Sequence, residues 1–211
     1  MNTNNPHESN DFFYPAYGQT PPWDIGAPQP ELLALLDEFP ATGPVLEVGC
    51  GTGALALALA ELGFNVLGVD LAENAINQAR ARAAAAPPEV ARLVAFNVGD
   101  ALHPSQFHGP FGAVVDSGFF HLFEAGERKH FVAELAATLK EGGRYYLLGF
   151  AINSPLPNAP RQVLESELRE LFPSEQGWRI LVLRPAEFLI RSARSNQVPA
   201  IAACIERVSM S

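Results

Sequence analysis

The chain has 211 residues, 48% of them hydrophobic, and a formal net charge of −9 at pH 7. No Lys or Arg precedes Arg80, so residues 1–79 contain ten acidic side chains and no fixed cation. Nucleic acids and anionic membranes are bound through clustered Lys and Arg side chains. This charge distribution therefore argues against both kinds of partner and favours a small molecule.

Several other classes of protein are also disfavoured by the sequence. The longest apolar run, residues 54–60, is much shorter than the ~20 residues that span a bilayer, and the N-terminus has no apolar secretory core. We therefore expect a soluble, cytoplasmic protein. Cys50 and Cys204 are too few for a disulfide framework and lie in apolar stretches, so we expect both to be reduced and structural. The histidines lack the spacing of metal ligands, and nothing in the sequence indicates an oligomeric state.

Elements of secondary structure follow from hydrophobic periodicity, taken in chain order. Residues 1–11 are predicted to be a disordered tail, and residues 12–43 an N-terminal lid followed by a helix over 30–39. Short β-rich runs then alternate with longer helical runs, which predicts a parallel sheet covered by helices on both faces. The expected strands are 45–48, 65–69, 92–96, 113–115 and 144–150, and the expected helices are 54–62, 73–86 and 127–140.

The pattern changes after residue 150. A Pro-rich loop over 151–161 precedes a helix over 162–172 and two β-like runs, 178–183 and 200–208. The sequence between these two runs has no strong helical pattern, which predicts an antiparallel hairpin at the edge of the sheet. Residues 44–211 are therefore interpreted as one doubly wound α/β domain, with its functional site at the carboxyl ends of the strands.

The segment VLEVGCGTGALALALA, residues 45–60, carries the strongest functional signal. A predicted strand runs into Gly49, Gly51 and Gly53 and then into a helix, and glycines at such a turn let backbone amides approach a ligand closely. The spacing also satisfies the dinucleotide-binding fingerprint, so two classes of cofactor remain open at this point.

Acidic side chains follow three successive predicted strands around this loop. Glu47 lies at the end of the first strand, where a carboxylate would be beside a cationic part of a ligand. Asp70 ends the second strand and can accept hydrogen bonds from a ribose diol, and Asp100 follows the third and can accept an adenine amino group. Together they indicate a nucleoside ligand with a positively charged tail. The other acids of residues 1–79 are expected to be mostly solvated.

The motifs VLEVGCGTG, GVDLAENAI, VGDAL and VVDSGFFHLF, over residues 44–150, resemble those of class I S-adenosylmethionine-dependent methyltransferases. The resemblance implies a Rossmann-like sheet of seven strands, S-adenosylmethionine as cofactor and S-adenosylhomocysteine as product. It assigns the methionine part to Glu47 and the loop Gly49, Cys50, Gly51, Thr52 and Gly53, the ribose region to Asp70 and Leu71, and the adenine to Gly99, Asp100 and Ala101. Asp116, at the end of the fourth strand, would face the methionine amine or the substrate.

Residues 12–33 resemble the N-terminal lid of the thiopurine, thiol and halide methyltransferase branch, although an additional proline departs from its pattern. By this resemblance Trp23 would cover the methionine end of the cofactor; the alternative is that Trp23 only packs the lid onto the domain. Aromatic residues are expected around the acceptor, with Arg161 either binding an anionic group or lying on the surface. The candidate acceptor-site residues are Phe13, Tyr14, Tyr17, Phe119, Phe120 and Arg161.

His121, just beyond the fourth strand, is the candidate general base, and Asp116 is the second candidate catalytic residue. The alternative role for His121 is to orient Asp116 or the lid by hydrogen bonding. A thiol with a pKa of ~8.5 is already partly ionised at neutral pH and needs no strong base. We therefore expect methyl transfer to a small aromatic or apolar acceptor, with sulfur favoured. The alternatives are an N- or O-methyltransferase, an NAD(P)-dependent oxidoreductase and a non-catalytic nucleoside-binding module.

Overall fold

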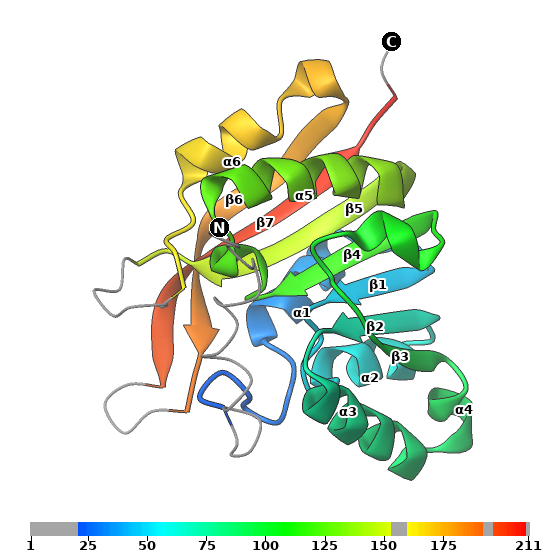
Figure 1. The fold of residues 1–211 in the computed structure, drawn as a ribbon. Helices are drawn as coiled ribbons and strands as arrows, with labels where there is room; N and C mark the ends of the chain where they lie inside the picture. Colours follow the sequence, from blue (N-terminus) through cyan, green and yellow to red (C-terminus); the bar gives the residue numbers. More distant parts are fainter. Residues whose placement is uncertain (1–20, 153–159, 192–195, 210–211) are drawn as a thin grey trace, which may run out of the picture.

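The computed structural model describes residues 21–152, 160–191 and 196–209. Seven strands form one sheet in the order β3-β2-β1-β4-β5-β7-β6, in which β1 to β5 are parallel and β7 runs antiparallel to both β5 and β6 (Figure 1). The predicted mostly parallel sheet with antiparallel C-terminal strands is confirmed. The strands are β1 Val45–Val48, β2 Val66–Asp70, β3 Val94–Val98, β4 Phe111–Ser117, β5 Leu139–Phe150, β6 Trp178–Leu189 and β7 Gln197–Arg207.

Every helix expected from periodicity is present within a few residues of its predicted bounds. A short helix that was not predicted follows the Pro87–Pro88 pair, because proline suits the first turn of a helix. None of the helices in the described ranges is long and apolar enough to cross a membrane. The α-helices are α1 Pro30–Glu38, α2 Ala54–Glu61, α3 Glu73–Ala85, α4 Pro88–Ala91, α5 Ala125–Thr138 and α6 Glu165–Leu171, and the 3₁₀ turns are η3 Pro104–Phe107, η4 Phe120–Leu122 and η5 Ser174–Gln176.

Alternate side chains of the strands build a separate core on each face of the sheet. Val45 packs in the cluster that contains residues of α1, α2 and α3, whereas its neighbour Leu46 packs in the cluster that contains residues of α5 and α6. Tyr146 and Tyr145 of β5 divide between the same two clusters. The connections therefore change face between β1 and β4, and ligands bind at such a switch point in open α/β sheets.

The two C-terminal strands are longer than predicted because prolines within them are tolerated. Pro185 lies in β6, which is the edge strand and pairs only with β7, so the missing N–H can face away from the sheet. Pro199 of β7 lies beyond the last residue of β5 in the register, and its carbonyl oxygen still accepts a hydrogen bond from the N–H of Ala151 at 2.9 Å. The tail predicted over residues 1–11 lies outside the described residues.

Candidate active site

The turn from β1 to α2 can be made only by glycine at two positions. Gly49 and Gly53 have positive φ angles of 65° and 80°, a conformation that other residues adopt only with strain. A Cβ on Gly49 would also lie 2.7 Å from Cδ2 of Phe119, and one on Gly53 would lie 2.6 Å from Cζ of Phe96. The backbone of this loop is therefore held against its neighbours without intervening side chains.

Glu47 places a buried carboxyl group beside the glycine loop. Its side chain is buried, and Oε2 has no hydrogen-bond partner among the described residues. Burial raises the pKa of Glu47 to about 8, with smaller contributions from the charges of Asp70 and Asp116, while the backbone N–H of Ala56 acts in the opposite direction. Because an unpartnered buried polar atom is costly, this oxygen fits a cationic hydrogen-bond donor of a ligand.

Asp70 joins the end of β2 to the glycine loop. Its Oδ2 accepts a hydrogen bond from the N–H of Gly51 at 2.9 Å, and its Oδ1 accepts one from the N–H of Ala72 at 2.8 Å. Burial raises its pKa, and these two hydrogen bonds lower it in part. The half-buried Leu71 follows directly. The acid predicted for a ribose therefore also orders the loop.

Asp100 lies at the carboxyl end of β3, on the same edge of the sheet as Asp70. The backbone N–H of Gly99 donates to the carbonyl oxygen of Asp70 at 3.0 Å, which connects the two strand ends. The Asp100 side chain is 34% exposed; its Oδ1 accepts from the N–H of Leu102, and its Oδ2 lies 3.0 Å from Nδ1 of His103. The adjacent Ala101 is buried in the core beside α5.

Asp116 is directed into the protein, and its predicted place facing the methionine amine or the acceptor stays a prediction. Its carboxylate is fully buried and accepts hydrogen bonds from the N–H groups of Phe119 at 2.7 Å and Phe120 at 3.0 Å and from the hydroxyl of Tyr145 at 2.7 Å. Burial raises its pKa to about 7 against the effect of these hydrogen bonds. Asp116 therefore holds the turn after β4.

His121 does not have the state expected of a general base, and it does not orient Asp116. Its buried ring accepts a hydrogen bond at Nδ1 from the N–H of Phe150 at 3.1 Å. Burial lowers its pKa to about 3, with a smaller contribution from Arg128. A neutral imidazole that accepts at Nδ1 carries its proton on Nε2. His121 is therefore a neutral side chain that anchors the end of β5, and its role as general base stays a prediction that this hydrogen bond does not favour.

Two aromatic residues that sequence reasoning missed lie next to His121. The ring centroid of Phe150 is 4.4 Å from that of His121, and the ring of Phe188 packs edge-on against Phe150 at 5.0 Å. Phe150 ends β5, and Phe188 lies near the end of β6 on the same edge of the sheet, as the register with the start of β7 shows. Its place at the end of a predicted strand could have identified Phe150 as a candidate site residue, as it did Asp70.

The predicted acceptor-site residues divide into four groups. Phe119 is half-buried over Gly49 and stays a candidate, whereas Phe120 is corrected to a core residue, because its ring is fully buried beneath the guanidinium of Arg128. Arg161 is 54% exposed and is paired with Glu124. Phe13, Tyr14 and Tyr17 lie outside the described residues.

Three further predicted cofactor residues contact the protein in different ways. Trp23 is half-buried and packs against the core cluster on the α1 side of the sheet. Cys50 is a buried free thiol whose side chain lies near Gly68 and donates a long hydrogen bond, 3.8 Å from sulfur to oxygen, to the carbonyl of Gly51. The hydroxyl of Thr52 donates to Oδ2 of Asp24 at 2.7 Å.

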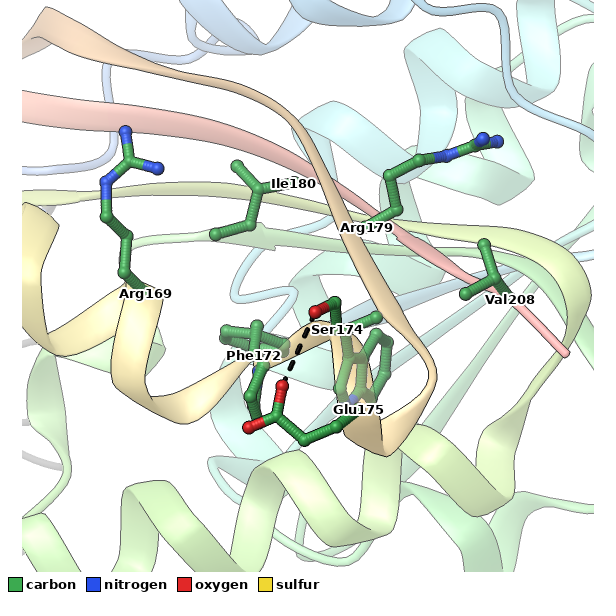
Figure 2. A pocket seen from close by; sticks show the side chains of 9 residues that line it. Arg169, Phe172, Ser174, Glu175, Arg179, Ile180 and Val208 are labelled. Carbon is green, nitrogen blue, oxygen red and sulfur yellow. Dashed lines mark hydrogen bonds between the residues drawn. The ribbon is translucent and has the colours of Figure 1, made fainter. Parts of the chain in front are cut away.

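A surface pocket lies far from these residues. Figure 2 shows Arg169 and Arg179 beside it, with the side chains of Ser174 and Glu175 in contact. Trp178, which also lines it, pairs with Arg207 at the amino-terminal edge of the parallel strands, opposite the glycine loop. The pocket is therefore separate from the candidate active site.

Comparison with known proteins agrees with this geometry. Residues 45–143 match a family model described as a methyltransferase domain. The chain is 36% identical over 168 residues to a 2-heptyl-1-hydroxyquinolin-4(1H)-one methyltransferase of Mycobacteroides abscessus, covering 79% of this chain and 72% of that protein. It is also 29% identical to a probable thiol methyltransferase 2 of Arabidopsis thaliana, covering 71% and 66% of the two chains.

A solved structure extends the likeness to almost the whole chain. The protein in that structure, from work on conversion of a disulfide bond into a thioacetal group during echinomycin biosynthesis, is 31% identical, covers 96% of this chain and 93% of its own, and superimposes with a TM-score of 0.79. The chain therefore belongs to the S-adenosylmethionine-dependent methyltransferases. It is an enzyme that uses S-adenosylmethionine as cofactor, which corrects the alternative of a nicotinamide-dependent oxidoreductase.

Proposed function

We propose that this methyltransferase acts on a small, planar, apolar acceptor and that it favours sulfur as the methylated atom. The observation that carries the proposal is the state of the two candidate catalytic groups. His121 is neutral with its proton on Nε2, and Asp116 is saturated with protein donors. An acceptor that ionises by itself near neutral pH, as a thiol does, requires neither group as a base.

The residues at the strand ends fit the parts of the cofactor. Glu47 would hold the methionine ammonium at its unpartnered oxygen, and Asp70 and Asp100 would hold the ribose and the adenine. When bound, S-adenosylmethionine supplies an electrophilic methyl group on a sulfonium. The contribution of the protein is then alignment of the acceptor and exclusion of water, which suits a soft nucleophile.

Aromatic side chains support a planar acceptor. Phe119, Phe150 and Phe188 lie at the same edge of the sheet as the glycine loop, and rings of this kind favour apolar, flat ligands. Two of the relatives are described by their names as acting on a hydroxyquinolinone and on a thiol. These names support the same class of acceptor here.

N- or O-methylation of an aromatic heterocycle is the second candidate. It is favoured by the relative from Mycobacteroides abscessus, whose substrate by name is a hydroxyquinolinone. An acidic hydroxyl group on such a ring would also ionise without a protein base, so the states of His121 and Asp116 do not separate the two candidates. Experiment must therefore identify which atom is methylated.

A panel of matched acceptors tests the proposal. We expect thiophenol to be methylated faster than phenol or aniline, and the rate at subsaturating thiol to rise with pH until the thiol is ionised. S-adenosylhomocysteine formation, measured from pH 5.5 to 9, gives both results. A faster rate with a hydroxyquinolinone than with any thiol would assign the enzyme to the second candidate, and absence of turnover with every acceptor of the panel would contradict the proposed class of acceptor.

A further inference from the structure

We propose that Asp24 is a positioning residue that connects the segment over residues 21–29, here called the cap segment, to the glycine loop. Its carboxylate accepts a hydrogen bond from the Thr52 hydroxyl at 2.7 Å and one from the N–H of Gly26 at 2.8 Å. Arg82 of α3 lies 3.7 Å from the same Oδ2 atom. The Asp24 side chain is 10% exposed, so these contacts replace water.

The hydrogen bond to Thr52 connects the cap segment with the proposed ribose-binding acid. Thr52 follows Gly51, whose N–H donates to Oδ2 of Asp70 at 2.9 Å. Asp24 and Asp70 therefore hold adjacent residues of the glycine loop, Thr52 and Gly51, each through one hydrogen bond. Displacing Asp24 would release one side of the loop while Asp70 still holds the other.

The cap segment is also anchored on both sides of Asp24 by hydrogen bonds that do not involve Asp24. The side-chain amide of Gln29 donates to the carbonyl oxygen of Leu189 at 3.0 Å and accepts from its N–H at 2.8 Å. The N–H of Arg191 donates to the carbonyl oxygen of Pro22 at 2.6 Å. Because the end of β6 and the residues directly after it supply these contacts, losing the Asp24 hydrogen bond should loosen the cap segment at the glycine loop without detaching it from the domain.

The hydrogen bond between Asp24 and Thr52 matters for ligand binding because Trp23 lies next to Asp24 in the cap segment. Trp23 precedes Asp24 and is half-buried against the core on the α1 side of the sheet, so a displacement of Asp24 would also move the neighbouring Trp23. The inference rests on the proposed cofactor site: a ligand seated on the glycine loop would be bound more tightly when the cap segment is held in place. Asp24 would then act on the ligand through Thr52, without contacting it.

Binding of S-adenosylhomocysteine to four variants tests the inference. Asp24→Asn keeps the shape of the side chain but removes its charge, and Thr52→Val keeps the shape but removes the hydroxyl. We expect each to raise the Kd about tenfold, since hydrogen bonds to charged groups contribute at least this much. The double variant should bind about as weakly as Thr52→Val alone, because the charge of Asp24 acts on the ligand through its hydrogen bond with the Thr52 hydroxyl. Thr52→Ser, which restores a hydroxyl, should recover most of the affinity.

Asp37→Asn is the matched control, because it removes the same charge from an exposed aspartate of α1. It should change the Kd less than twofold. In a Trp178→Phe background, Trp23 is the remaining tryptophan. Its emission in the ligand-free protein should shift to longer wavelength in Asp24→Asn and Thr52→Val but not in Asp37→Asn. The emission of Trp23 therefore reports a change in the surroundings of the cap segment without depending on catalytic activity.

The outcomes separate this inference from the proposed site. If the wild-type protein does not bind S-adenosylhomocysteine, the cofactor site itself is wrong. If the wild type binds and both single variants bind equally well, Asp24 has no positioning role. Additive losses in the double variant would also overturn the inference, because they would mean that Asp24 and Thr52 act separately. Should Asp24→Asn fail to fold, the comparison of Thr52→Val with Thr52→Ser still gives the result.

Discussion

At the scale of single residues, the state of Glu47 depends on whether the site is filled. With a pKa of about 8 in the ligand-free protein, Glu47 is mostly protonated at pH 7. A cation held at Oε2 stabilises the carboxylate and lowers this pKa. Binding at pH 7 should therefore release a proton, and affinity should rise as the pH increases from 6 toward 8.

Calorimetry in buffers of different ionisation enthalpy measures this proton release. We expect S-adenosylhomocysteine to release a proton from the wild type at pH 7 and not from Glu47→Gln, which should also bind more weakly at every pH. An equal proton release from the variant would show that another group titrates, and Glu47 would then not be the ligand of the ammonium.

His121 makes stability depend on pH in the acid range. Its pKa is about 3 in the folded protein, below the ordinary value of 6.5, so the unfolded chain binds a proton that the folded chain does not. The contribution is complete above pH 6.5 and is lost as the pH falls from 6.5 toward 3. The free energy of unfolding of His121→Asn, whose amide oxygen can still accept from the Phe150 N–H, should fall less steeply over this range.

Urea denaturation between pH 4 and 8 checks the prediction. The difference between the wild type and His121→Asn should be constant above pH 6.5 and should shrink in more acidic solution. Parallel curves over the whole range would contradict it, because they would mean that His121 has an ordinary pKa in the folded state.

At the scale of elements, the glycine loop depends on Asp70 as well as on its glycines. Removing this carboxylate leaves the N–H groups of Gly51 and Ala72 without their acceptor and also removes the proposed ribose contact. Asp70→Ala should therefore weaken binding of S-adenosylhomocysteine by about 1–3 kcal/mol. Titration calorimetry gives the value, and Asp37→Asn serves again as the control. Unchanged affinity would count against the assigned site.

Local signals in the sequence predicted the helices well and their ends less well. The start of α5 was predicted at residue 127, two residues late, because Glu124 and Glu127 form a capping box that adds residues before the apolar pattern begins. The helix α4 is a single turn, too short for periodicity to detect. Boundaries of this kind depend on a few hydrogen bonds rather than on a repeating pattern.

At the scale of the whole molecule, the amino-acid composition of the last two strands agrees with their places in the sheet. β7 is almost continuously apolar and lies between two strands, whereas β6 contains Arg179, Arg184 and Glu187 and lies at the edge. The antiparallel pair was predicted, but its insertion with β7 next to β5 was not. A strand buried on both faces favours an apolar sequence, which explains the arrangement.

In the folded protein, one acidic side chain of the N-terminal third of the chain has a structural role. Its charge argued against nucleic acids and membranes, and most of its acids were expected to be solvated. Asp24 departs from that expectation, since its side chain is 10% exposed and hydrogen-bonded to the glycine loop. Nothing in the local sequence around Asp24 identifies Thr52 as its partner.

The sequence by itself determined the alternating α/β fold, the glycine loop and the acidic residues at successive strand ends, because each depends on neighbouring residues and on periodicity. Only the tertiary structure determined which polar side chains are directed into the protein. Asp116 is hydrogen-bonded to Tyr145, and His121 to Phe150, in each case across 29 residues of sequence. Asp24 is hydrogen-bonded to Thr52 across 28 residues. Such pairs form only when the register of the strands and the packing of the loops bring distant residues together, so no local pattern encodes them.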